Sequence, residues 1–280
     1  MGRNRYIKYL LLLFLIFLAN VFPIHTEAAS RKKLIFNKTY TQFDITNDNV
    51  PDKVRIIAEG NYDDYFERLI IHINGKQTLT IETGFYKGDL DGWVQCELLK
   101  MDNGNEYLYL YLGGDNGDGP IEIYEYQVDK LVKIVDIDDS MYDVGGHIGC
   151  RVKKVSGNKI HLEINAMSKA LAYVKFDAAY KVKNGKLIQT SKVHKIDGYY
   201  KSYKYGKGYL TTIKSMWLYK DYKGKHKGKK ISKGNKVKVT KCYINAKKIM
   251  FYGITKTGYK GWFKSPKDYN KKFMEIAYAG

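Results

Sequence analysis

Cysteine is scarce in this sequence of 280 residues, which contains only Cys96, Cys150 and Cys242. Three is too few, and an odd number, for a small scaffold held together by disulfides. None of the three lies in a closely spaced cysteine pair, so a structural zinc site is not indicated. The sequence leaves open whether Cys96 bonds to Cys150. Three buried thiols are the expected state.

Catalytic signatures are also missing. The sequence has no G-x-S-x-G nucleophile elbow, no H-E-x-x-H metal motif, no Walker loop and no dinucleotide-binding fingerprint. Neighbouring acids occur at Asp63-Asp64 and Asp138-Asp139. Adjacent residues of a strand point to opposite faces, so neither pair converges on a substrate without a turn. These absences favour a protein that binds rather than catalyses.

Long apolar runs are confined to the N-terminus. Basic residues within the first eight positions precede an apolar run over residues 9–24, and small residues follow at Ala28 and Ala29. This order is typical of a secretory signal peptide. We expect residues 1–28 to be removed by cleavage after Ala28, with cleavage after Ala29 as the alternative. The run is shorter than the about 20 residues that span a bilayer, so membrane attachment would need an uncleaved signal.

Acidic residues are scarce in the last third of the chain. Residues 198–280 contain 22 lysines against three acids, a balance of +19, whereas residues 30–197 contain 23 basic and 25 acidic residues, a balance of −2. This asymmetry predicts a polyanionic partner for the basic segment. The segment has no arginine, the residue favoured for bidentate recognition of phosphates and bases. With export, the expected partners are anionic cell-wall polymers or peptidoglycan, and no nucleic acid. A basic face that serves only solubility is the alternative.

Turn residues separate short runs that are rich in β-branched and aromatic residues. Asn74-Gly75, Gly157-Asn158 and Asn184-Gly185 each lie between two such runs and predict β-hairpins. The stretch 107–112 alternates Tyr with Leu, which places three tyrosines on one face of a strand and three leucines on the other. We expect the leucine face to belong to the core. An exposed tyrosine ladder that binds carbohydrate is the alternative.

These patterns predict an all-β protein in two domains. An N-terminal antiparallel domain built of hairpins is expected over residues 31–197. A connector rich in Tyr, Lys and Gly follows over residues 198–208, where the charge shift begins. A small basic β domain is expected over residues 209–280.

The most chemically suggestive motif begins at Asp44. Side-chain oxygens at its alternate positions, with the carbonyl of position 7, can converge on one hard cation, as in EF-hand-type loops; the candidate ligands are Asp44, Thr46, Asp48, Val50 and Asp52. Asn49 stands where such loops usually have glycine, and Asn tolerates the left-handed conformation. The bidentate Glu of position 12 is replaced by Arg55. The motif predicts a weak calcium site, and an Asx-rich turn without metal is the alternative.

Several short stretches resemble known families. Residues 44–57 resemble the opening of a group of secreted proteins from Gram-positive, clostridia-like bacteria and the calcium-loop segment of FG-GAP/VCBS-type β repeats. Residues 121–126 and 180–187 are similar to the same group. Residues 230–239 and 256–264 carry a K-G-x-K-V-x-V … G-x-x-G-W pattern and resemble a bacterial SH3-like domain.

The resemblance implies an FG-GAP/VCBS-like N-terminal domain and a small SH3-like β-barrel at the C-terminus. The usual N-V-R-x-G-P start of the SH3-like domain is replaced by residues 216–221, so its ligand-groove residues do not carry over to this chain. The aromatic residues that we expect to contact the cell wall are instead Trp217, Tyr219, Tyr259 and Trp262.

The leading hypothesis is a secreted, non-catalytic cell-envelope protein. Its basic SH3-like domain would associate with the cell wall, and its N-terminal domain would be a binding or structural module. One alternative is a cell-wall polymer hydrolase with its site in the N-terminal domain. Another is a calcium-stabilised structural module.

Overall fold

The computed structural model describes residues 29–60, 65–86, 94–112, 121–136, 148–201, 204–245, 248–265 and 272–276. Within these ranges every regular element is a strand, and neighbouring strands pair antiparallel. The predicted all-β class is therefore confirmed. The described ranges hold no helix that could cross a bilayer. The expected signal peptide, residues 1–28, lies outside the described residues.

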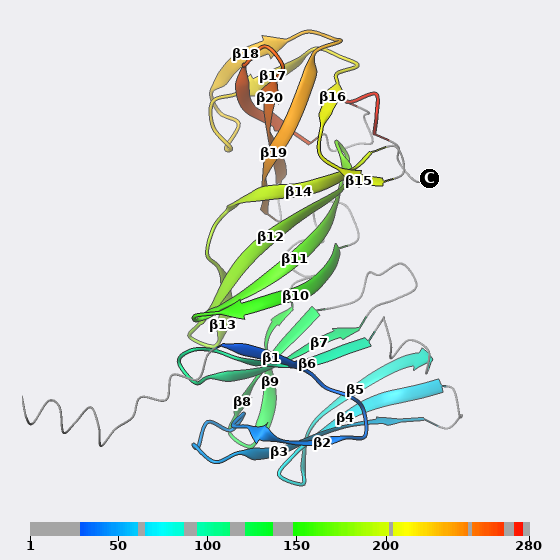
Figure 1. The fold of residues 1–280 in the computed structure, drawn as a ribbon, viewed down its shortest axis with the longest axis vertical. Helices are drawn as coiled ribbons and strands as arrows, with labels where there is room; N and C mark the ends of the chain where they lie inside the picture. Colours follow the sequence, from blue (N-terminus) through cyan, green and yellow to red (C-terminus); the bar gives the residue numbers. More distant parts are fainter. Residues whose placement is uncertain are drawn as a thin grey trace, which may run out of the picture.

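A four-stranded sheet forms one end of the molecule (Figure 1). Its strands, in spatial order, are β2 (Thr39–Phe43), β3 (Asp52–Glu59), β4 (Tyr65–Ile73) and β5 (Lys76–Tyr86). Asn74 and Gly75 join β4 to β5 with φ angles of 53° and 80°. Two positive φ angles are what a two-residue type I′ turn requires, so the hairpin predicted at this turn is confirmed.

A five-stranded sheet packs on the first. Its strands, in spatial order, are β1 (Ser30–Lys33), β6 (Val94–Lys100), β7 (Glu106–Leu112), β8 (Ile121–Gln127) and β9 (Lys130–Asp136). Leu98, Leu108 and Leu110 face the four-stranded sheet and share one buried cluster with Val54, Leu69 and other residues of that sheet. These two sheets form what we call the N-terminal sandwich.

The opposite face of β7 is buried as well. Tyr107, Tyr109 and Tyr111 are at most 8% exposed and belong to a second apolar cluster, which continues into the strands that follow. The Tyr109 hydroxyl donates to the carbonyl of Cys150, 3.4 Å away. The leucine face is core, as expected, but the tyrosine face is core too. An exposed tyrosine ladder is therefore ruled out, because a third layer of strands covers it.

That third layer belongs to a sheet of twelve strands. Its main path runs β10 (Ile148–Ser156), β11 (Lys159–Ser168), β12 (Ala172–Lys183), β14 (Val193–Lys201), β19 (Lys236–Asn245), β20 (Lys248–Thr255), β21 (Lys260–Lys264), β17 (Met216–Tyr219) and β18 (Lys227–Ile231). Three short strands pair beside this path: β13 (Lys186–Gln189) on β12, β15 (Lys204–Gly206) on β14 and β16 (Tyr209–Thr211) on β19. The predicted hairpins at Gly157-Asn158 and Asn184-Gly185 join β10 to β11 and β12 to β13.

Strand β14 joins the two halves of this sheet. Its later part pairs with β12, with Tyr199 opposite Val174, and its first residues pair with β19, with Val193 opposite Tyr243. The stretch 198–208, which its composition marks as a connector, holds the end of β14 and all of β15. We call β10 to β15 the middle strands. The backbone pairing continues from them into the basic C-terminal strands, β16 to β21.

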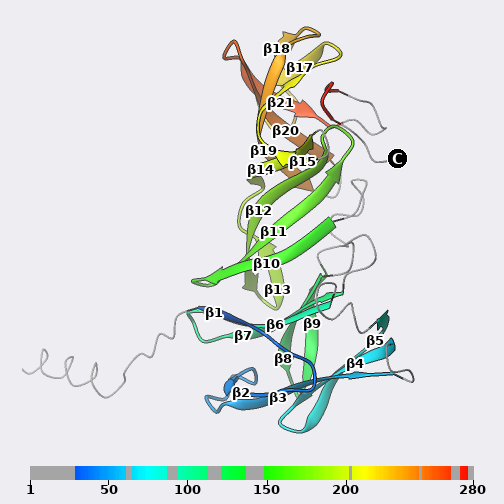
Figure 2. The same cartoon turned by 45° about the vertical axis from the view of Figure 1, so that its right-hand side comes forward.

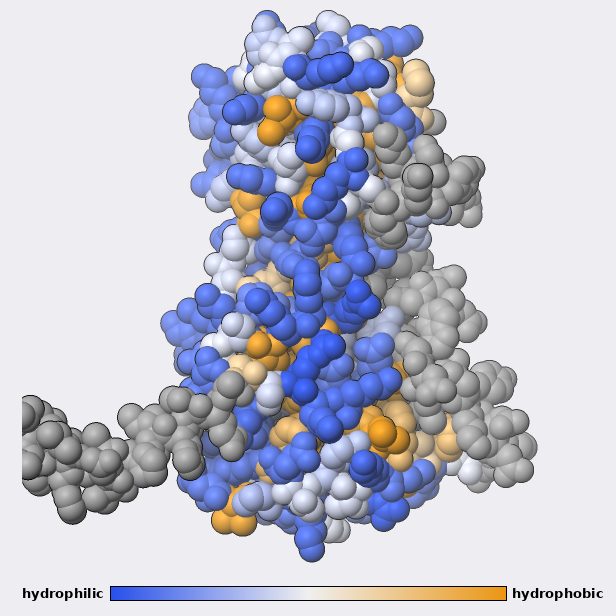
Figure 3. All heavy atoms as spheres, viewed as in Figure 1, coloured by the Kyte–Doolittle hydropathy of each residue, from blue (hydrophilic) through white to orange (hydrophobic). Residues whose placement is uncertain are grey.

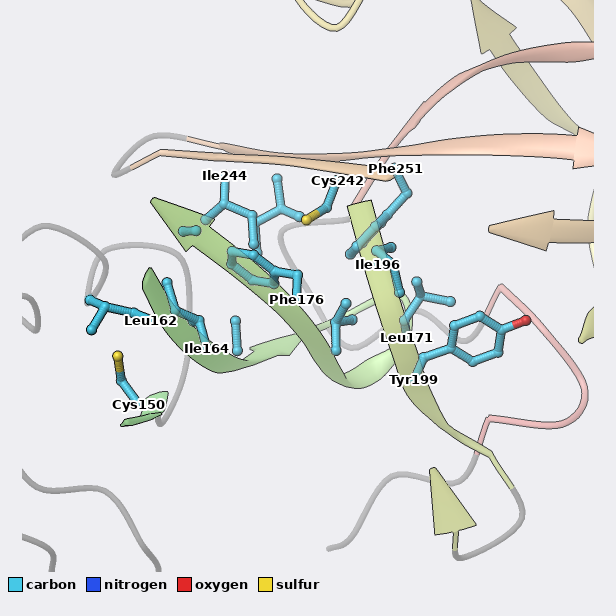
Figure 4. Packing of buried hydrophobic residues seen from close by; sticks show 14 of the residues in the cluster. Cys150, Leu162, Ile164, Leu171, Phe176, Ile196, Tyr199, Cys242, Ile244 and Phe251 are labelled. Carbon is cyan, nitrogen blue, oxygen red and sulfur yellow. The ribbon is translucent and has the colours of Figure 1, made fainter. Parts of the chain in front are cut away.

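The layers stack along the long axis of the molecule, with the C-terminal strands at the end opposite the four-stranded sheet (Figures 1 and 2). One apolar cluster runs from Tyr109 of β7 through Phe176 of β12 to Phe251 of β20. Figure 4 shows Phe176 beside Cys242 and Ile244 of β19, where the middle and C-terminal strands meet. A shared apolar interior therefore accompanies the shared strand pairing.

The described cysteines carry no disulfide. Cys96, Cys150 and Cys242 are free and buried. Cys96 lies in the cluster between the two sheets of the sandwich, whereas Cys150 lies in the cluster on the other side of the five-stranded sheet. Burial raises the pKa of the Cys96 and Cys242 thiols far above the usual range. The expectation of three buried thiols is confirmed.

The short C-terminal segment 272–276 docks against β16. Phe273 and Ile276 are at most 1% exposed, and the Phe273 ring meets the Phe263 ring edge-on at 5.6 Å. Between them, the Glu275 carboxylate accepts bonds from the backbone N–H and the hydroxyl of Thr211, both at 2.7 Å. The segment therefore closes the core of the C-terminal strands.

This docking gives a direct test. We expect Phe273→Ala to lower the free energy of unfolding of the mature chain by about 3–5 kcal/mol, because it leaves a cavity in a closed core. Its neighbour Met274 is 61% exposed, so Met274→Ala is the matched control and should change stability by less than about 0.5 kcal/mol. Urea unfolding followed by tryptophan fluorescence measures both. Equal effects of the two substitutions would show that the segment does not dock.

Candidate functional site

The C-terminal strands β16 to β21, which we call the C-terminal unit, carry aromatic side chains on their outer face. In β17, Met216 and Leu218 are buried in the large apolar cluster, while Trp217 and Tyr219 alternate with them and point outward. In β21, Phe263 joins the same cluster and its neighbour Trp262 faces the other way. The period of two along each strand thus separates an apolar inner face from an aromatic outer face.

Strand register aligns these outward residues across the sheet. Lys241 of β19 lies opposite Tyr252 of β20, Tyr252 lies opposite Trp262 of β21, and Trp262 lies opposite Tyr219 of β17. The rings of Tyr252 and Trp262 are 5.2 Å apart at 65°. Cross-strand aromatic pairs of this kind stabilise a sheet by about 0.2–1 kcal/mol each. The result is a row of side chains that crosses four strands.

A turn after β17 closes over this row. Its Tyr222 stacks on Tyr243 at 4.7 Å and meets Trp262 edge-on at 6.1 Å. Asp221 holds the turn, because its Oδ2 accepts bonds from the backbone N–H and the ring Nδ1 of His226, at 3.1 and 2.8 Å. Burial opposes ionisation of Asp221, but the bonds from His226 outweigh it and lower the pKa of the carboxyl to about 2. The turn is therefore held by a carboxylate that is ionised at neutral pH.

Lysine ammonium groups lie over the rings of this face. Two of them, from Lys227 and Lys230, flank the single ring of Trp217 at 5.2 and 6.0 Å. The other such pairs on this face are Lys264 on Tyr219, Lys241 on Tyr252 and Lys248 on Tyr243, between 5.4 and 5.7 Å. Lys229 lies over Tyr259 of the β20–β21 turn at 5.0 Å. Cation–π contacts at exposed sites are worth about 0.5–1 kcal/mol each. The lysine ammonium groups of this face are therefore held close to its rings.

The charge of this face is not balanced by the described acids of the unit. Its lysines far outnumber the two acids in its described part, Asp221 and Glu275. The view in Figure 3 shows hydrophilic and near-neutral residues over most of the upper end of the molecule, with apolar residues in small separate patches. Such a surface attracts polyanions through many exposed charges at once.

The four predicted contact residues differ in their access to solvent. Trp217 is 36% exposed and Tyr259 47% exposed, whereas Tyr219 is half-buried and Trp262 is only 7% exposed. Trp217 and Tyr259 can therefore touch a ligand directly, and Trp262 supports the face from within. Tyr222, Tyr243 and Tyr252 also belong to this face, although they are not among the predicted contact residues. The alternation of residues in β19 and β20 was the signal that could have placed Tyr243 and Tyr252 on this face.

The loop predicted to bind calcium lies at the far end of the molecule, between β2 and β3. Its carboxylates accept bonds from the loop's own backbone. Asp44 accepts from the N–H groups of Asp48 and Asn49, at 2.9 and 2.8 Å, and Asp48 accepts from the N–H of Val50 at 2.8 Å. Asn49 has a φ of 67°, the left-handed conformation expected at this position. The loop is thus built as a series of Asx turns.

Asp52 is the buried member of the loop. It is 1% exposed, and its two oxygens accept from the Thr46 N–H at 2.9 Å, the Thr46 hydroxyl at 3.2 Å and the Asn74 amide at 2.6 Å. Asp52 therefore ties the loop to the β4–β5 turn. Across the described residues, no group of three His, Cys, Asp or Glu side chains is arranged to hold a metal ion.

The N-terminal sandwich also contains a titratable acid with a shifted pKa. Burial raises the pKa of Glu106 to about 7, although Lys100, 3.2 Å away, partly opposes that rise. The Glu106 side chain is fully buried, so a polymer substrate has no access to it. This acid therefore gives no support to the hydrolase alternative.

Comparison with known proteins adds no relative. No family model, curated protein or solved structure matches this chain.

The bonds of Asp52 generate a prediction for this loop. In Asp52→Asn, whichever way the new amide turns, its NH2 meets a donor, either the Thr46 N–H or the Asn74 amide. We expect a loss of about 1–3 kcal/mol in the free energy of unfolding, measured by urea titration, because a buried donor loses its partner. Asp48→Asn is the matched control: its remaining oxygen still accepts from Val50 at an exposed position. Equal stability of the two variants would contradict the role of Asp52.

Proposed function

We propose that this is a secreted, non-catalytic protein of the cell envelope, and that its C-terminal unit binds anionic cell-wall polymers. The observation that carries the proposal is the outer face of that unit, where five lysine ammonium groups lie over aromatic rings. The N-terminal sandwich and the middle strands then act as a binding or structural module that the C-terminal unit holds at the wall.

The chemistry of the face favours a long, flexible polyanion over a single small anion. Lysine is a point charge on a flexible stem, whereas arginine provides the rigid fork that fixes one phosphate or carboxylate. Many lysines on one face attract a polyanion without fixing any one of its charged groups at a single position. A repeating polymer such as a teichoic acid, or peptidoglycan that carries one, satisfies that requirement.

We also propose that the C-terminal unit is an SH3-like small barrel. Two glycines support this, because each lies too close to a residue of the neighbouring strand to carry a side chain. A Cβ at Gly253 would lie 2.6 Å from Val237, and one at Gly261 would lie 2.8 Å from Leu218. Small barrels need glycine where strands bend sharply against one another. The pairing of the described strands, in the order β16, β19, β20, β21, β17 and β18, leaves β16 and β18 as the two ends of the curved sheet.

Salt should control the binding of the mature chain, residues 29–280, to purified Gram-positive cell walls. We expect the chain to pellet with walls at about 0.1 M NaCl and to be released towards about 1 M, because the screening length falls from about 10 to about 3 Å. Walls stripped of their anionic polymers are the comparison. Equal pelleting with stripped walls would remove the electrostatic part of the proposal.

Matched lysine variants locate the binding face. The double variant Lys227→Gln with Lys230→Gln removes the two charges beside Trp217 and should weaken pelleting. Lys181→Gln with Lys183→Gln removes two exposed charges from β12 and should change pelleting little. Trp217→Ala should weaken binding by about fivefold, or about 1 kcal/mol, through the loss of ring contacts. Equal losses from both lysine pairs would show that attraction is spread over the whole molecule.

We further propose that the Asp44 loop binds calcium weakly and stabilises the N-terminal sandwich. The support is the concentration of oxygen atoms in a loop whose ends are already fixed by Asp52 and Asn74. Thermal unfolding of the mature chain in about millimolar calcium, against the same chain with chelator, tests this, since extracellular calcium modules bind at about 10⁻⁴–10⁻³ M. The expected result is a higher melting midpoint with calcium. An unchanged melting midpoint would contradict the proposed calcium site.

A further inference from the structure

The start of the described chain is fixed by a specific hydrogen bond. The backbone nitrogen of Ala29 donates to Oδ1 of Asp102 at 2.6 Å. The Ala29 side chain is partly buried against the large apolar cluster. The strand that follows, β1, pairs with β6 along its whole length, from Ser30 opposite Lys100 to Lys33 opposite Glu97.

Asp102 lies where three segments meet. It belongs to the turn between β6 and β7, and its own N–H donates to the carbonyl of Gly157 in the β10–β11 turn at 3.2 Å. The next residue, Asn103, donates its N–H to the side-chain oxygen of Asn158 at 3.2 Å. The Asp102 carboxylate therefore binds the residue just before β1 at the seam between the N-terminal sandwich and the twelve-stranded sheet.

We infer that Asp102 is the binding site for the α-ammonium group that cleavage after Ala28 creates on Ala29. Hydrolysis of the Ala28–Ala29 bond by a signal peptidase consumes one water molecule, leaves a carboxylate on Ala28 and leaves the ammonium on Ala29. The nitrogen that already donates to Asp102 is neutral before cleavage and positively charged after it. A hydrogen bond between a neutral N–H and the Asp102 carboxylate thereby becomes an ion pair, in which both partners are charged.

This inference concerns maturation, and it is independent of the proposed binding to cell walls. Before cleavage, the seam has a hydrogen bond at this position. After cleavage the same nitrogen also carries a positive charge, so removal of the signal peptide strengthens the seam. Cleavage after Ala29 would instead remove the bonded nitrogen, so the ion pair requires cleavage after Ala28.

The pH dependence follows from the other charges nearby. Lys100, across from Ser30, is paired with Glu106 at 3.2 Å, and Arg31 is 3.8 Å from Glu97; Lys159 flanks the β10–β11 turn. A free α-amino group has a pKa of about 7.7–8.0, and Asp102 raises that pKa in the folded chain. The stabilisation is therefore complete below about pH 7.7 and is lost as the pH rises through the folded pKa.

The test compares two mature chains in thermal unfolding. One begins at Ala29, and the other carries one extra glycine before Ala29, which restores the neutral amide and moves the charge one residue away. At pH 7 we expect the chain that begins at Ala29 to melt about 1–3 °C higher, a shift typical of one exposed ion pair. The difference should vanish by about pH 10. Glu106 titrates in both chains, so its contribution cancels.

The same pair of chains carrying Asp102→Asn is the control, and there the two midpoints should coincide. Equal midpoints without that substitution, or a difference that persists with it, would overturn the inference. If Asp102→Asn does not fold, a second measurement decides. The pH dependence of the acylation rate of the α-amine, in the chain that begins at Ala29, gives the pKa of that amine. A pKa above about 8 supports the ion pair, and a lower one overturns it. Mass spectrometry of the exported protein must also show Ala29 as its first residue, because Ser30 there would overturn the inference.

Discussion

The central strands β6 and β7 of the five-stranded sheet are buried on both faces, and the rest of the molecule is arranged around that constraint. One face packs on the four-stranded sheet and the other on β10, β11 and β12. A sheet in that position cannot alternate apolar with polar residues, as a sheet with one solvated face does. Strand β7 meets the requirement with leucines on one side and tyrosines on the other, since a tyrosine can bury its ring and still place its hydroxyl on a partner.

The second apolar cluster extends from the five-stranded sheet to the C-terminal unit. It includes Tyr109, Phe176 and Phe251, which come from the N-terminal sandwich, the middle strands and the C-terminal unit. Strand β14 connects the same regions through backbone hydrogen bonds. His194, at this junction, is buried next to Phe176, and burial lowers its pKa, so its ring is neutral at pH 7. These regions are therefore linked both by apolar side chains and by backbone pairing.

Much of the fold could be read from the sequence because its hairpin turns depend on local chemistry. Asn74-Gly75 and Asn184-Gly185 have the positive φ angles that their residue types permit. The burial of the Tyr107 face could not be predicted from local sequence, because it depends on strands more than 40 residues away in sequence. The docking of Phe273 and the stacking of Tyr222 also depend on distant partners. At the candidate site, residue type alone named four aromatic contact residues, but it could not show that Trp217 and Tyr259 are exposed whereas Trp262 is almost fully buried.

The lysines of β18 have one more consequence, which concerns the edge of the sheet. Among the described strands β18 pairs only with β17 and so forms an edge of the sheet, and three of its five residues are Lys227, Lys229 and Lys230. Charged side chains on an exposed edge strand oppose the addition of a strand from a second molecule, since like charges would be brought together. The ammonium groups that we assign to the wall therefore also keep neighbouring copies of the protein from joining edge to edge.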